Sequence, residues 1–96
     1  MNDRNRKNLL EMAEKLDVIA GNPRLTGEQL RKATEDALKT HVLGSGTDAE
    51  RTIFNAIEDL NSVLRSDDTL DEKWLSWARG RIVQFTNEVR QYLGES

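Results

Sequence analysis

Residues 75–92, "LSWARGRIVQFTNEVRQY", carry the strongest periodic pattern of the chain and decide its fold class. Apolar side chains recur there at steps of three and four residues without interruption, which is the spacing of one face of an α-helix. A pattern sustained over this length predicts a long helix that packs at a shallow angle against helices of similar length. Its apolar positions are Leu75, Ala78, Ile82, Phe85, Val89 and Tyr92.

Three earlier segments repeat this helical spacing. Gly21 and Pro23 terminate the first of them, because glycine accepts the left-handed conformation of a helix C-terminus and proline cannot continue a helix. Nowhere do apolar and polar residues alternate between hairpin turns, as they would in a β-strand. The sequence therefore predicts a single all-α domain, residues 1–96, built as a small antiparallel bundle of four helices. Their expected bounds are about residues 3–20, 27–42, 48–65 and 70–93.

Capping residues indicate where the later helices begin. Thr26 with Gln29, and Thr47 with Glu50, have the spacing of a capping box, in which each side chain hydrogen-bonds the backbone of the other residue. The apolar stripe of the second helix is thin, so neighbouring helices are expected to approach it closely. Three residues compete to cap the last helix, namely Asp68, Thr69 and Asp71.

The composition is typical of a soluble helical protein, since 36% of the 96 residues are apolar and 32% are charged. Cysteine is absent, which excludes disulfides and thiolate chemistry and fits a reducing compartment. The chain shows neither an apolar signal segment nor a long uncharged apolar run, so we expect a cytoplasmic protein without a membrane span. The net charge of −3 disfavours nucleic acid as a partner, because phosphate binding needs clustered Lys and Arg.

No motif for catalysis, metal binding or nucleotide binding is present. His41, the sole histidine, lies in the apolar stripe near the end of the second helix, where it can hydrogen-bond a terminal carbonyl, and no second His or Cys exists to share a metal ion. The acidic stretch that starts at Asp67 lacks the glycine and glutamate of an EF-hand loop. Ser45 lacks the nucleophile elbow of a hydrolase, and no phosphate-binding loop occurs. We expect no enzyme activity, no metal and no cofactor.

The two tryptophans of the last helix are predicted to have different roles. At 100° per residue, Trp74 falls about 50° from the centre of the apolar stripe, whereas Trp77 falls about 110° away, beside Leu70 and Arg81. Trp74 is therefore expected in the core. Trp77 either covers a loop or stacks under Arg81, or it contacts a partner, since Trp and Arg are enriched at interface hot spots.

The predicted partner-binding surface combines Trp77 with the acidic start of the last helix. Acidic residues at a helix start are favoured by the helix dipole, and they also offer a landing patch for a basic partner. The candidate residues are Trp77, Arg81, Leu70, Asp67, Asp68, Asp71 and Glu72. Further apolar residues lie off their helices' stripes and would form a contact patch if the fold brought them together, namely Leu10, Val18, Phe54 and Val83.

These observations favour a non-enzymatic protein–protein interaction module. We expect a small acidic helical regulator or inhibitor that binds another protein through an exposed helix face, with a homodimer as a further possibility.

The stretch "LGSGTDAERTIFNAIEDL" resembles the small helical biofilm and acid-resistance regulators of enteric bacteria. The likeness covers under half of the chain and rests on Ser45 and Gly46, followed by an Ile-x-x-x-Ile-x-x-Leu run. The alternative function is accordingly a small bacterial DNA-associated transcriptional or biofilm and stress regulator acting as a dimer. Phosphate contacts would then come from basic residues near the N-terminus and on the last helix, namely Arg4, Arg6, Lys7, Arg79 and Arg90.

Overall fold

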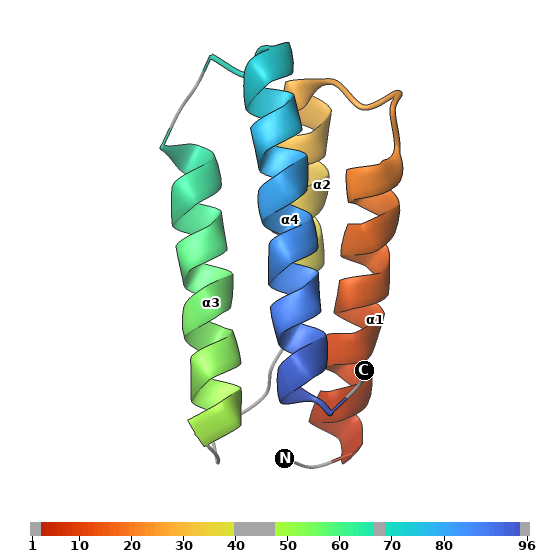
Figure 1. The fold of residues 1–96 in the computed structure, drawn as a ribbon, viewed down its shortest axis with the longest axis vertical. Coiled ribbons are helices and arrows are strands. Elements are labelled where there is room, and N and C mark those ends of the chain that lie inside the picture. Colours follow the sequence, from red (N-terminus) through yellow and green to blue (C-terminus); the bar gives the residue numbers. More distant parts are fainter. Residues whose placement is uncertain (1–2, 40–47, 67–68, 95–96) are drawn as a thin grey trace.

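The computed structural model describes residues 3–39, 48–66 and 69–94, and these residues form the expected bundle of four helices (Figure 1). The described part of the chain contains no β-strand. Consecutive helices run in opposite directions, so the bundle is antiparallel. The helices are α1 (Asp3–Gly21), α2 (Gly27–Leu38), α3 (Asp48–Arg65) and α4 (Glu72–Tyr92).

The last helix, α4, lies at the centre of the view in Figure 1, with α1 on one side, α3 on the other and α2 behind. It packs against all three other helices, and α2 also contacts α1 and α3. The first turns of α1 and α3 are joined by a buried hydrogen bond, in which Asn5 Nδ2 donates to the Glu50 carboxylate. The long helix predicted from the periodic pattern thus organises the bundle.

The core follows the apolar stripes, except at the two ends of the α4 stripe, where Leu75 is only partly buried and Tyr92 is exposed. Ala78, Ile82, Phe85 and Val89 are buried as predicted, but Tyr92 is 52% exposed. Tyr92 is the last residue of α4, and Leu93, its C-cap, occupies the buried position instead. The other helices contribute their own stripes to the same core, including Leu9, Met12, Leu16, Leu30, Ile53, Leu60 and Leu64.

Capping explains two of the helix starts. The Thr26–Gln29 capping box is confirmed, with Gln29 N donating to Thr26 Oγ1 at 3.2 Å and Thr26 N donating to Gln29 Oε1 at 3.0 Å. Asp71 caps α4, because its Oδ1 accepts a hydrogen bond from Trp74 N at 2.8 Å. The proposed box at Thr47 and Glu50 includes a residue outside the described part of the chain.

Two of the approximate helix bounds differ from the structure by more than one residue. The α2 helix ends at Leu38 rather than 42, with Lys39 N–H donating to the carbonyls of Glu35 and Asp36; residues 40–42, including His41, lie outside the described residues. The α4 helix begins at Glu72 rather than 70, because Leu70 has φ of 49°, in the left-handed region that a right-handed helix excludes.

Candidate partner-binding site

The two tryptophans of α4 differ in exposure in the predicted direction. Trp74 is 4% exposed and belongs to the core, whereas Trp77, three residues later, is 43% exposed. Asp71 caps the helix at this point, because its carboxylate accepts a hydrogen bond from the backbone N–H of Trp74. A half-exposed tryptophan on a regular helix is a rigid, apolar contact group.

A surface hollow of about 440 Å³ lies beside Trp77, where α3 ends and α4 begins. We call it the Trp77 hollow. The buried Nε1 of Trp74 has no hydrogen-bond acceptor among the described residues. The lining mixes indole rings with hydroxyl, carboxylate and ammonium groups, so it offers both apolar and polar contacts: Ser66, Thr69, Asp71, Lys73, Trp74 and Trp77.

Leu70 lies outside α4, whereas the expectation from helical spacing placed it on the helix beside Trp77. Its backbone leaves the helical path, and the residue packs against Gly27 at the start of α2. There it lines a different hollow, together with Pro23, Leu25 and Arg79. Leu70 is also partly buried and packs against the core.

Arg81 lies on the side of α4 that faces α3. It lines a small hollow of about 110 Å³ with Asp59 and Glu88, and its Nε is buried without an acceptor among the described residues. Arg81 and Trp77 therefore line separate hollows of the same helix.

The acidic residues of the predicted surface have separate roles. Asp67 and Asp68 lie outside the described residues. Asp71 is exposed but its carboxylate caps α4, and Glu72 is exposed in the first helical turn, where the dipole favours a negative charge. Of the five candidate residues in the described part of the chain, Trp77 and Asp71 line the Trp77 hollow, Leu70, Asp71 and Glu72 line the hollow beside Pro23, and Arg81 lines a third.

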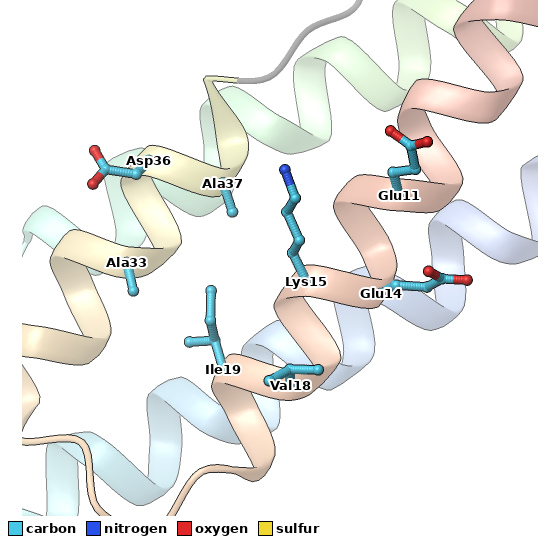
Figure 2. Close-up of a pocket in the computed structure, with 8 residues that line it drawn as sticks. All are labelled: Glu11, Glu14, Lys15, Val18, Ile19, Ala33, Asp36 and Ala37. Atoms are coloured by element: carbon cyan, nitrogen blue, oxygen red, sulfur yellow. The ribbon is translucent and has the colours of Figure 1, made fainter.

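A second, larger surface feature lies between α1 and α2, and sequence analysis missed it. This α1–α2 groove has a volume of about 730 Å³ and a mostly apolar floor. Figure 2 shows Lys15 rising between the two helices, with Ile19 directed toward Ala33 and with Glu14 and Asp36 pointing outward on opposite sides. The lining residues are Glu11, Glu14, Lys15, Val18, Ile19, Ala33, Asp36 and Ala37.

Two sequence signals pointed to this groove without locating it. Val18 lies off the apolar stripe of α1 and is 73% exposed, the largest value among the exposed large hydrophobic residues described. Ala33 and Ala37 give α2 a thin face, and their short side chains leave space beside α1. Neither signal shows which helices are neighbours, so only the fold brings the two faces together.

Three of the four arginines named for DNA binding, Arg6, Arg79 and Arg90, make contacts within the bundle. Arg79 Nη2 donates to the Asn22 carbonyl at 2.7 Å, beyond the end of α1. Arg90 Nη2 donates to Asp17 Oδ2 at 2.5 Å, and Asp17 Oδ1 accepts from the buried Thr86. Arg6 Nε donates to the Leu93 carbonyl at 3.4 Å. These side chains thus hold α1 against the two ends of α4.

Neither a metal centre nor a membrane span can be assigned in residues 3–39, 48–66 and 69–94. No group of three or more His, Cys, Asp or Glu side chains gathers there in a way that could hold a metal ion. The helices of these segments are too short or too polar to cross a lipid bilayer.

Comparisons with known proteins add no relative. The chain matches no protein-family model, no curated protein and no solved structure at a significant level. These comparisons therefore add no support for the resemblance to the biofilm and acid-resistance regulators.

Proposed function

We propose that this protein is a non-enzymatic binding module that contacts another protein through the exposed face of α4 around Trp77. The observation that carries the proposal is the 43% exposure of Trp77 beside the Trp77 hollow. Large aromatic residues that anchor interfaces do so by filling a desolvated pocket at the centre of the contact. Lys73 and Asp71 supply charged groups at the edge of the same hollow. A regulator or inhibitor acting in the cytoplasm, on another protein or on a second copy of itself, is the role that fits these features.

The test compares Trp77→Ala with Tyr92→Ala, because both residues are exposed aromatics on α4 and only one belongs to the proposed surface. The wild-type chain and each variant would be cross-linked to their neighbours in the host, and the captured proteins would be quantified and compared. We expect the amount of one defined protein to fall about 30-fold with Trp77→Ala and to stay the same with Tyr92→Ala. A 30-fold change corresponds to the hot-spot threshold of about 2 kcal/mol. Equal retention by both variants would refute the role of Trp77.

Sedimentation equilibrium on the same variants tests the homodimer version. If the wild-type chain dimerises and Trp77→Ala shifts it to monomer while Tyr92→Ala does not, the second copy is the partner. A dimer that is insensitive to Trp77→Ala would place the self-contact elsewhere.

A different measurement tests the alternative function of a DNA-associated regulator. The guanidinium groups of Arg79 and Arg90 hydrogen-bond other residues of the bundle, which leaves them less available to phosphates. Binding to random duplex DNA across a salt series would reveal phosphate contacts by a steep negative slope of log K against log salt concentration. We expect at most weak, non-specific binding to DNA, and no steep slope of this kind.

A further inference from the structure

We propose that the α1–α2 groove binds an amphipathic helix of another protein, one whose apolar stripe is flanked by Lys and Arg. This inference goes beyond the proposed function, because the groove lies on α1 and α2, not on α4, and contains no part of the Trp77 hollow.

The first step is the shape of the groove. Its lining on α1 runs from Glu11 to Ile19, which is about two turns or roughly 12 Å at 1.5 Å per residue. On α2 it runs from Ala33 to Ala37, which is about one turn or roughly 6 Å. Val18 is 73% exposed on one wall, and Ile19 is only partly buried. This apolar surface would lose its contact with water if a partner side chain filled the space.

The second step concerns the secondary structure of the occupant. Two adjacent helices repeat their side chains every 5.4 Å along the groove, which matches leucines spaced at three and four residues on a third helix. The α1–α2 pair already accepts one helix in this way, since α4 packs against both of them. An extended peptide would instead need a sheet edge for its backbone hydrogen bonds, and the described chain has no strand. A helix is therefore the fitting occupant.

The third step is the charge of the rim. Carboxylates stand on both walls, Glu11 and Glu14 on α1 and Asp36 on α2, against the single ammonium group of Lys15 in the lining. Lys39 lies 3.8 Å from Asp36 and shares part of that charge, although both side chains are largely exposed. The remaining excess is negative, as is the whole chain at −3. Lys and Arg flanking an apolar stripe complement this rim and steer its approach.

The same charges argue against a second copy as occupant. A two-fold contact places the same surface patch of both subunits face to face, so the carboxylate-rich rim of one copy would meet the carboxylate-rich rim of the other. Like charges brought together in this way oppose association.

The experiment uses two synthetic peptides of about 18 residues, long enough for measurable helicity in water. Both carry leucines at helical spacing on an alanine background, and they differ only in having either lysine or glutamate beside the stripe. Fluorescence anisotropy gives the dissociation constants, and amide chemical-shift changes in the labelled full chain give the footprint. We expect the lysine peptide to bind about tenfold or more tightly than the glutamate peptide. The footprint should centre on Val18, Ile19 and Ala33.

Two pairs of matched variants separate the groove from general electrostatics. Val18→Lys should weaken the lysine peptide about tenfold, whereas Phe54→Lys, which makes the same charge change at an exposed residue of α3, should not. The double variant Glu11→Lys with Glu14→Lys should reverse the preference between the peptides. Glu58→Lys with Asp59→Lys, exposed on α3, should leave the preference in place.

Four outcomes would overturn the proposal. The first is the absence of saturable binding of the lysine peptide up to about 1 mM, a concentration near the weakest useful affinity. The second is a footprint outside the groove, and the third is an equal effect of the two members of each matched pair of variants. A concentration-dependent dimer whose interface protects Val18 would also overturn it, because a second copy would then be the occupant. None of these results bears on Trp77, so the proposed function is tested separately.

Discussion

Gly27, in the first turn of α2, lies directly against the backbone of Leu70, which precedes α4. A Cβ atom added at Gly27 would be 2.5 Å from the Leu70 carbonyl oxygen and 2.9 Å from the Leu70 Cβ. Real Cβ atoms do not approach so closely, so the contact requires glycine at this position. The start of α2 and the start of α4 are thereby packed together at one end of the bundle.

Gly27→Ala is therefore expected to lower the free energy of unfolding by about 1–3 kcal/mol, the usual cost of overpacking. The control is Gly80→Ala, because Gly80 is an exposed glycine within α4 and has open space around its added Cβ. That change should raise stability by about 0.5–1 kcal/mol, since alanine is the better helix former. Urea titrations of both variants measure the difference, and a stabilised Gly27→Ala protein would contradict the contact.

The bundle could be predicted from the sequence because local patterns determine helices. The apolar stripe of α4, which is buried from Ala78 to Val89, and the Thr26–Gln29 capping box depend on residues a few positions apart, and both are confirmed. The start of α4 was misplaced for the opposite reason. The left-handed Leu70 packs against Gly27, which is distant in sequence, and no local pattern reports such a contact.

The candidate site was predictable to the extent that it depends on one helix. Angular position on α4 was sufficient to separate the buried Trp74 from the exposed Trp77. The grouping of Trp77 with Leu70 assumed a regular helix from residue 70, whereas Leu70 lies outside α4. The α1–α2 groove was missed because it depends on how two helices pack, and residue spacing within either helix does not contain that information.

Ile82 and Val83 are adjacent on α4 and provide a test of the core. Ile82 is fully buried and Val83 is 44% exposed. Ile82→Ala should cost about 2–5 kcal/mol because it removes core contacts and opens a cavity. Val83→Ala should change stability by no more than about 0.5 kcal/mol, as is usual for surface positions. Similar losses for both variants, measured by thermal unfolding, would mean that the helix is rotated from the orientation described.

The tryptophans can be distinguished in the free protein by fluorescence. Iodide should quench Trp77, which is 43% exposed, far more strongly than Trp74, which is 4% exposed. Single-tryptophan variants, Trp74→Phe and Trp77→Phe, assign the signal to each ring. We also expect Trp74→Ala to cost about 3–5 kcal/mol, the range for large aromatic truncations in a core, and Trp77→Ala to cost much less. Equal quenching of the two rings in a monomeric sample would remove the basis for a contact role of Trp77.

The hydrogen bond between Glu35 of α2 and Arg65 of α3 should make stability depend on pH. Arg65 Nε donates to Glu35 Oε1 at 2.9 Å, and this hydrogen bond, with the charge of Arg65, lowers the pKa of the Glu35 carboxyl below its ordinary value of 4.5. The folded protein thus binds the proton less readily than the unfolded chain. The stabilisation is fully present above the unfolded pKa and is lost as the pH falls through the lower, folded pKa.

Glu35→Gln should therefore lower the melting temperature slightly near pH 7, and the difference from the parent protein should disappear in acid, below the folded pKa. The effect is small because Arg65 is largely exposed to solvent, which screens the pair. Arg65→Gln should show the same pH dependence, and combining the two changes should add nothing further at neutral pH. Melting temperatures of the three variants across this pH range check the prediction, which fails if the Glu35→Gln difference is the same in acid as at pH 7.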